Sequence, residues 1–233
     1  MRFVRATLVT TMVLFGFAAL VHVVRYALLL INRSILLPTV VAGAATWVGV
    51  AASVLAVFAM IATAIVMTNW LIGRRAAAFA RLRRDETRST LELYSGCLIP
   101  VVNLFFAPVF VIELALIEAR ARDLRRRIVM WWCGWVFSFF LSAYAAVSAL
   151  PFFTRDMQSV ADNTVTTAIA YLAALAALLL LNKVFAGFES TPVDRPLKRW
   201  VAVRDDAQTA AAAEPVKQES AIPVESERQD PAA

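Results

Sequence analysis

His22 and Arg25 are the first residues of this sequence whose types and spacing could do chemistry. They stand three residues apart within a long apolar stretch, so a helix would carry both on one face. Charge in apolar surroundings is costly, and such a pair could relay protons or bind an anion. The favoured interpretation is structural: Arg25 extends its head group to the nearest water, and His22 stays neutral with one partner on another helix.

A second set of candidates lies in residues 91–117, where an apolar run is interrupted by Gly96, Pro100, Asn103 and Pro108. A straight helix through either proline would lose a backbone donor and about 3 kcal/mol. We therefore expect a re-entrant hairpin or a kinked interfacial helix, the alternative being an ordinary fifth span with proline kinks. For Asn103 we favour an amide that caps a backbone group freed by one proline over an amide that binds a ligand.

Glu113 lies in the same segment, inside the apolar run VFVIELALIEA. Its carboxylate could pair with Arg120, two helical turns later, or with a cation near Asn103. The simpler interpretation is that Glu113 marks the point where a helix leaves apolar surroundings.

The composition places these residues in a membrane protein. Of 233 residues, 61% are apolar, and the mean hydropathy is +0.69, whereas soluble domains are about half apolar. The net charge of +6 comes mainly from arginines beside apolar stretches, a pattern that reports membrane orientation and not nucleic-acid binding. Cys97 and Cys133 are too few for a disulfide framework and are expected as free thiols.

Five apolar stretches are long enough to cross a hydrocarbon core of about 30 Å, which takes about 20 helical residues. They are residues 7–31, 39–72, 91–117, 128–153 and 164–188. Lysine and arginine favour the cytoplasmic side. If residues 91–117 enter and leave on that side, 20 of the 23 basic residues lie there and only Arg25, Arg33 and Arg155 do not. The predicted fold class is therefore all-α: a polytopic bundle of four spans plus one broken segment, with both termini cytoplasmic.

Two further segments carry charge. The stretch EARARDLRRR is predicted to contact anionic lipids of the inner leaflet, at about 1 kcal/mol per basic residue. The contacts are assigned to Arg120, Arg122, Arg125, Arg126 and Arg127. Beyond the transmembrane domain, residues 1–202, the segment 203–233 has no aromatic residue and is rich in alanine and glutamate, so we expect a disordered cytoplasmic tail.

Three motifs in residues 70–135 carry a family resemblance. They are Trp70 followed by Arg74 and Arg75, the motif GCLIPVVNLFFAP, and the pair Trp131 and Trp132 after a basic stretch. Together they resemble the DUF4328 family of bacterial four-span membrane proteins, a domain of unknown function, in which an aromatic residue is common at the position of Cys97. The resemblance implies a four-span fold with a defined Pro–Asn element, and it implies no activity.

The residue inventory disfavours an enzyme. The chain has one histidine and no HExxH, Gly-x-Ser-x-Gly, P-loop or dinucleotide motif, so no catalytic residue, metal or cofactor is predicted. A non-enzymatic accessory or scaffold protein of the bacterial cytoplasmic membrane needs none of these. Its partners would be the bilayer and a membrane protein or a second copy of the chain. The alternative is an oligomeric transporter or channel for a small solute or ion that uses the broken segment.

Overall fold

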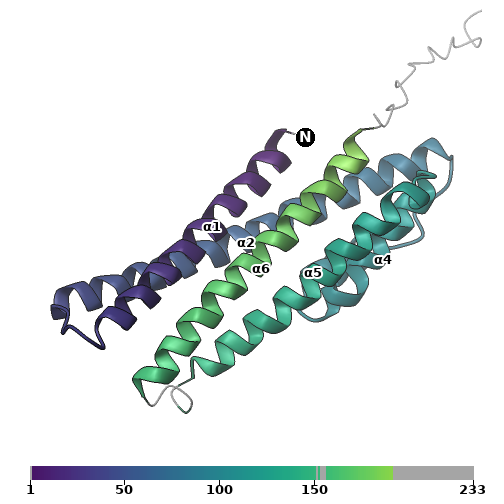
Figure 1. The fold of residues 1–233 in the computed structure, drawn as a ribbon. Coiled ribbons are helices and arrows are strands. Elements are labelled where there is room, and N and C mark those ends of the chain that lie inside the picture. Colours follow the sequence, from purple (N-terminus) through teal and green to yellow (C-terminus); the bar gives the residue numbers. More distant parts are fainter. Residues whose placement is uncertain (1, 151, 153–155, 191–233) are drawn as a thin grey trace, which may run out of the picture. The chain divides into compact units, whose positions relative to one another are not determined.

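The computed structural model of this protein describes residues 2–150, 152 and 156–190, with the backbone alone at residue 157. These residues form six α-helices and no strand (Figure 1), which confirms the predicted all-α fold class. The helices are α1 (Arg2–Ile31), α2 (Thr39–Arg81), α3 (Thr90–Leu98), α4 (Val102–Ile117), α5 (Ala121–Ser148) and α6 (Met157–Glu189). The predicted disordered tail, residues 203–233, lies outside the described residues, as does Arg155.

Four of the helices, α1, α2, α5 and α6, are long and apolar enough to cross a membrane. The chain is accordingly a membrane protein with four candidate spans. Helix α4 is apolar but has only 16 residues, fewer than the roughly 20 that a span requires. Helix α5 begins at Ala121, before the predicted span 128–153. The arginine-rich stretch that precedes this span is therefore part of the same helix.

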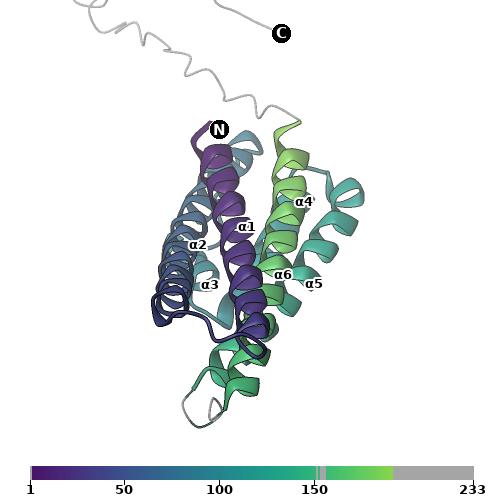
Figure 2. The same ribbon diagram turned by 60° about the vertical axis from the view of Figure 1, so that its left-hand side comes forward.

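The helices follow one another in space in the order α5, α6, α1 and α2 (Figures 1 and 2). Among the described residues, α2 shares no backbone contact with α5 or with α6. The hairpin formed by α3 and α4 packs against α2, and α4 also packs against α5. It therefore bridges the two outermost helices of the row.

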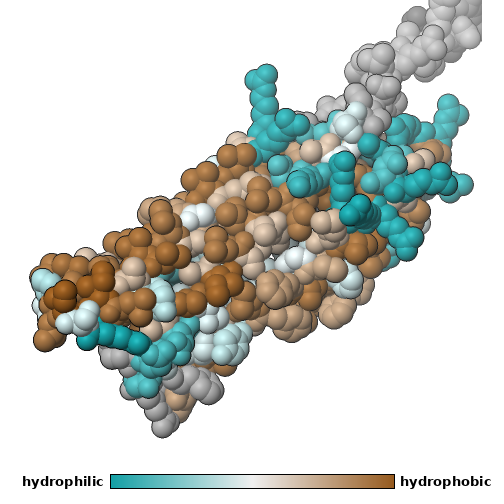
Figure 3. Space-filling view, in the orientation of Figure 1, coloured by the Kyte–Doolittle hydropathy of each residue, from teal (hydrophilic) through white to brown (hydrophobic). Residues whose placement is uncertain are grey.

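The hairpin lies at what we call the basic end, where α1 begins, α2 and α6 end and α5 begins. Arg5 pairs with Glu189 there, which joins the start of α1 to the end of α6. Figure 3 shows hydrophilic residues gathered at this end beyond a largely hydrophobic body. At the opposite end, α1 connects to α2 and α5 to α6. Both ends of the α3–α4 hairpin thus leave from the basic end, as predicted for a segment that does not cross.

Pro100 produces the break between α3 and α4. Ile99, the residue before it, is extended (φ −73°, ψ 120°), as expected ahead of a proline. Val101 has φ 70° and ψ −51°, and the Val102 amide donates to the Pro100 carbonyl over 2.8 Å, which closes a three-residue γ-turn. A β-branched residue in this region is strained by about 1–3 kcal/mol, so the packing of the hairpin must hold the turn in place.

Pro108 does not interrupt the backbone, and the prediction that it would is wrong. It lies inside α4, where it deprives the Leu104 carbonyl of its usual amide donor. The indole Nε1 of Trp132, on α5, donates to that carbonyl over 2.8 Å. A side chain from a neighbouring helix thus supplies the missing hydrogen bond, and α4 continues through the proline.

Gly96 allows α3 to lie directly on α4. A Cβ atom at this position would stand 2.6 Å from Cε2 of Phe110 and 3.2 Å from Cβ of Phe106. Phe110 is completely buried, so it has little room to yield. Glycine at residue 96 is therefore a requirement of the close helix approach.

Candidate functional site

Arg74 is the first of two adjacent arginines that fasten the basic end. Its Nε donates to Oε1 of Glu118 over 2.7 Å and its Nη2 donates to Oε2 over 2.9 Å. The same Nη2 donates to the Phe188 carbonyl, near the end of α6, over 2.8 Å. Both charged side chains are only 4% exposed. This two-point ion pair joins α2 to the turn between α4 and α5 and to the end of α6.

Arg75 reaches the hairpin from the next position of α2, and its side chain is 1% exposed. Nη2 donates to Oε1 of Glu86 over 2.8 Å and Nη1 donates to Oε2 of Glu113 over 3.0 Å. Nη1 also donates to the Phe110 carbonyl over 3.2 Å. Arg75 therefore holds both the loop after α2 and the middle of α4.

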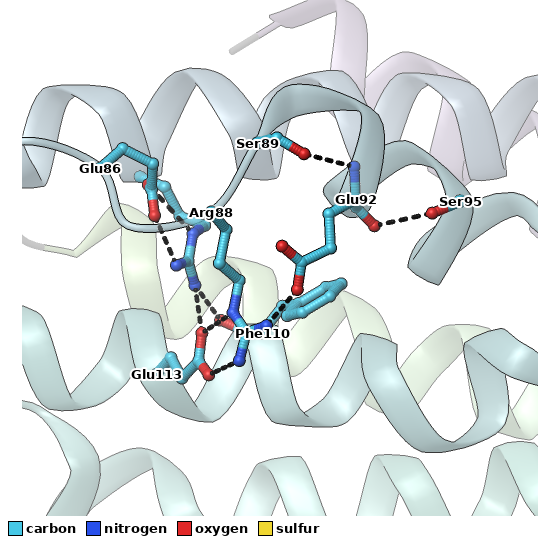
Figure 4. A network of polar contacts seen from close by, with 8 residues as sticks. Glu86, Arg88, Ser89, Glu92, Ser95, Phe110 and Glu113 are labelled. Carbon is cyan, nitrogen blue, oxygen red and sulfur yellow. Dashed lines mark hydrogen bonds and ion pairs between the residues drawn. The ribbon is translucent and has the colours of Figure 1, made fainter.

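Arg88 approaches Glu113 from the loop side (Figure 4). Its Nη2 donates to Oε1 of Glu113 over 2.6 Å and its Nε donates to Oε2 over 3.1 Å. Its Nη1 donates to Glu92 in the first turn of α3, which begins with Ser89 accepting from the Glu92 amide. We call Arg75, Glu86, Arg88, Glu92 and Glu113 the hairpin cluster.

The cluster keeps Glu113 ionised. Partial burial alone would raise the pKa of the carboxyl, but the hydrogen bonds and charges of Arg88 and Arg75 outweigh it and hold the pKa below its ordinary value. Hydrogen bonds to Glu113 and then Glu92 raise the pKa of Arg88. Glu113 therefore remains a carboxylate beside the Arg88 guanidinium at neutral pH.

The pairing with Arg120, one of the two possibilities considered for Glu113, is not formed. Arg120 turns to the end of α6, where its guanidinium donates to the Gly187 carbonyl and, over 3.0 Å, to Oγ of Ser190. Carbonyls in the last turn of a helix have no amide donor within the helix, and an arginine side chain can donate to them instead. Glu113 is instead reached by arginines that precede it in the chain.

The arginines assigned to lipid contact fall into two groups. Arg120 is partly buried and bonded to α6 as described. The other four remain exposed on the first two turns of α5: Arg122, Arg125, Arg126 and Arg127.

His22 and Arg25 are brought together against a small-residue face of α2. His22 is 5% exposed, its Nε2 lies 3.1 Å from Oγ of Ser53, and its ring stacks on Tyr171 of α6 with centroids 5.6 Å apart. Gly49 of α2 faces both side chains, and a Cβ there would be in ordinary van der Waals contact with them, 3.6 Å from His22 and 3.8 Å from Arg25. This arrangement matches the predicted histidine with one helix partner.

Asn103 lies in the first turn of α4 and is partly buried. Its backbone amide donates to the Ile99 carbonyl over 3.0 Å, but its side-chain amide forms no hydrogen bond within the described part of the chain. The backbone group freed by Pro108 is satisfied by Trp132 instead. The prediction that Asn103 caps such a group is therefore not supported by the geometry.

Three residues were not singled out from the sequence: Glu86 and Glu118, which pair with the two arginines, and Arg88, which pairs with Glu113. Arg74 and Arg75 counted only as orientation signals and as part of the family resemblance. The available signal was the position of Glu113 and Glu118 at the end of an apolar helix, because carboxylates there require cations. Which cations they meet depends on the fold, since Arg75 and Glu113 are far apart in sequence.

The comparisons with known proteins address the same region. The sequence model of DUF4328, a domain of unknown function, matches residues 33–190. The chain belongs to this family. Among curated proteins and among solved structures, no significant match is found. The matched region contains α2 to α6, and with them Arg74, Arg75 and the hairpin that these arginines hold.

Proposed function

We propose that this member of DUF4328 is a non-enzymatic accessory or scaffold protein of the bacterial cytoplasmic membrane, with its basic end in the cytoplasm. The observation that carries the proposal is that some arginines of that end are buried in ion pairs and others are exposed. Arg74 and Arg75 are buried and committed to the hairpin, while four arginines at the start of α5 are exposed. A polar end that presents exposed positive charge suits the binding of anionic headgroups or of an acidic partner surface.

The orientation of the protein follows from the same charges. Positive residues next to spans favour the cytoplasmic side, and the basic end carries nearly all of them. The described part of the opposite half has only Arg25 and Arg33. Four exposed arginines at about 1 kcal/mol each would hold several anionic lipids, with Asp123 offsetting part of the attraction. The partners would be inner-leaflet lipids and a membrane protein or a second copy of the chain.

The test is purification of the full chain in native lipid, followed by mass spectrometry of the retained lipids. Replacing Arg122, Arg125, Arg126 and Arg127 by glutamine should lower the enrichment of phosphatidylglycerol over phosphatidylethanolamine. The control Arg33→Gln, at the opposite end, should not lower it. Equal enrichment in both variants would rule out the assigned lipid contacts. A stoichiometric membrane protein in the same preparation would support the accessory role.

One feature favours a second candidate, an oligomeric transporter or channel for a small solute or ion. The α3–α4 hairpin lies between α2 and α5, two helices without backbone contact in the described residues, where a moving segment could open a path. A homo-oligomer that produces solute flux in proteoliposomes would favour this candidate. Absence of flux together with a stoichiometric partner would exclude it.

A further inference from the structure

A cavity of about 750 Å³ lies between α2 and α5, which share no backbone contact in the described residues. Its volume is within the roughly 300–1,000 Å³ of small-molecule sites. Most of the lining is apolar, and none of the described lining residues carries a charge. Hydroxyl groups from three helices interrupt the apolar lining, among them those of Ser53, Ser138, Ser142 and Tyr171.

Ser138 and Ser142, both on α5, present free hydroxyls to this cavity. Ser138 is only 8% exposed, and neither serine side chain has a hydrogen-bond partner in the described part of the chain. Buried threonines of the neighbouring helices, in contrast, donate to the carbonyl four residues earlier over 2.8 Å, as Thr68 and Thr164 do. The unpartnered side-chain atoms that the described fold encloses completely lie elsewhere. A molecule in the cavity can therefore reach the two serine hydroxyls.

Contacts between α5 and α6 place the two serines at the level of Tyr171. Toward the basic end, Gly134 lies against Ala177. Toward the opposite end, Nδ2 of Asn163 donates to the Ala145 carbonyl over 2.8 Å. The serines lie between these two contacts along α5, and Tyr171 lies between them along α6, so their hydroxyls share one level of the cavity.

Ser53 of α2 completes this level. Its Oγ lies 3.1 Å from Nε2 of His22, and it is also a hydrogen-bond partner of the Tyr171 hydroxyl. The ring of Tyr171 stacks on His22 in turn, so the same contacts hold both side chains in place. We call Ser53, Ser138, Ser142 and Tyr171 the hydroxyl belt.

The hydroxyl belt limits the chemistry of a ligand. A serine hydroxyl can donate one hydrogen bond and accept others, and leaving it unsatisfied in apolar surroundings costs about 1–3 kcal/mol. An ion would lose its hydration in a cavity without a charged partner, which is far more costly. Water suits only the belt, because a buried water needs two to four polar partners. A fitting ligand is therefore uncharged, with one polar group at the belt and an apolar body beside it.

We infer that the cavity binds an uncharged, largely apolar small molecule whose hydroxyl or carbonyl oxygen hydrogen-bonds Ser138 and Ser142. Such a molecule dissolves in the bilayer and enters from the side, where the lining residues Ala143 and Ala146 are exposed. This site goes beyond the accessory role and does not involve the exposed arginines of α5, so either proposal can fail while the other stands. It restricts the alternative transporter to uncharged solutes.

The probe is an octanol with a photoactivatable diazirine on its chain, added to the full protein in vesicles of phosphatidylglycerol and phosphatidylethanolamine. Crosslinks are mapped by mass spectrometry. Labelling at Ser138 and Ser142 should saturate and should be displaced by excess octanol. Labelling at Phe137 and Phe140, which are exposed on α5, reports ordinary bilayer contact and should do neither. Octane at the same membrane concentration should compete about fivefold more weakly than octanol, the effect of one hydrogen bond.

Two pairs of variants separate the belt from the rest of the bundle. Ser138→Ala should weaken competition by octanol about fivefold and leave octane unchanged. The control Thr166→Val, which removes a hydroxyl bonded to the Asp162 carbonyl outside the cavity, should change neither. Val57 and Val54 of α2 are 49% and 47% exposed, but only Val57 lines the cavity. Val57→Phe should abolish the saturable labelling, and Val54→Phe should not.

Three results would overturn the inference. They are labelling at Ser138 and Ser142 that does not saturate, equal competition by octane and octanol in the native chain, or equal labelling of the Val57→Phe and Val54→Phe variants. The first two use the native chain, so they remain decisive if a variant fails to fold.

Discussion

The basic end and the middle of the bundle are held together by different means. At the basic end, ion pairs of Arg74 and Arg75 connect α2 with α4, with the turn after α4 and with the loop before α3. Arg74 also donates a hydrogen bond to the Phe188 carbonyl near the end of α6. In the middle, neighbouring helices pack through buried apolar side chains, among them Ala18, Ala52 and Leu178, and through hydroxyl groups. Thr11 and Thr63, for example, share a hydrogen bond of 2.7 Å between α1 and α2.

This contrast identifies the contacts that hold the α3–α4 hairpin in place. Among lipid chains, apolar surfaces gain little from contacting one another, so helix association depends on close packing and polar contacts. The four long helices have both along their length, whereas α3 and α4 are short and contain a strained turn at Val101. Ion pairs to α2 therefore fix the position of α3 and α4 against the bundle. The account therefore predicts that the hairpin fails before the bundle does.

The largest effect is expected from Arg74→Met, which leaves the Glu118 carboxylate buried without its cation. Loss of one partner of a buried pair costs about 3–5 kcal/mol, measured as the free energy of unfolding in detergent micelles. The control Arg126→Met, on the exposed face of α5, should change it by about 0.5 kcal/mol or less. The double variant Arg74→Met, Glu118→Gln should recover part of the loss. If Arg74→Met and Arg126→Met change the free energy of unfolding by similar amounts, buried and exposed arginines do not differ in their contribution to stability.

Gly96→Ala should have the next largest effect, because its Cβ would overlap the Phe110 ring. Overpacking of this kind costs about 1–3 kcal/mol. The matched control is Gly73→Ala, where a Cβ meets no atom within 4 Å and helix propensity gains about 0.5–1 kcal/mol. The two substitutions should shift the midpoint of unfolding in opposite directions. A shift in the same direction would mean that α3 does not lie on Phe110.

Acid should loosen the hairpin before the spans. The pKa of Glu113 in the folded protein lies below the ordinary value of 4.5, so its contribution is fully present above pH 4.5 and is lost as pH falls through the folded-state pKa. Hydrogen exchange of α3 amides, corrected for intrinsic rates, should accelerate below pH 4.5. Glu113→Gln should make this acceleration disappear, and Asp123→Asn, an exposed carboxylate at the same end, should not. Acceleration of the same size in Glu113→Gln would assign it to another group.

The smallest effect is expected at the opposite end. Asp156 caps α6, because its carboxylate accepts a hydrogen bond from the Ser159 amide over 2.9 Å. In return, the Ser159 hydroxyl oxygen accepts from the Asp156 backbone amide. The hydrogen bonds from the Ser159 side chain and backbone hold the pKa of Asp156 below its ordinary value. Asp156→Ala should speed hydrogen exchange only in the first turn of α6 and leave the hairpin unchanged. Faster exchange in α3 would show that the two ends are coupled.

Much of the fold could be predicted from composition and charge. Apolar length and the placement of basic residues together predicted the four spans. Pro100 and its neighbours predicted the break, because a missing donor and a restricted preceding residue act locally. Pro108 could not be judged in the same way. Its tolerance depends on Trp132, which another helix brings to the Leu104 carbonyl.

The candidate site was less predictable for the same reason. That His22 has one hydrogen-bond partner on another helix could be predicted, because a buried charge is costly and any neighbouring helix can supply such a partner. The partners of Arg74 and Arg75 come from three separate elements, and no local pattern pairs Arg75 with Glu113 in preference to Arg120. The choice is made by the hairpin, which turns the Glu113 face of α4 toward α2.

Labelling of single cysteines shows directly whether α3 and α4 enter and leave on the side of the N-terminus. In a chain with Cys97 and Cys133 replaced, cysteines are placed at the exposed positions Ser34, Arg122 and Gln158. In intact cells, a membrane-impermeant thiol reagent should react at 34 and 158 and should reach 122 only after the membrane is opened. Reaction at 122 from outside would show that residues 91–117 cross the membrane and would contradict the account.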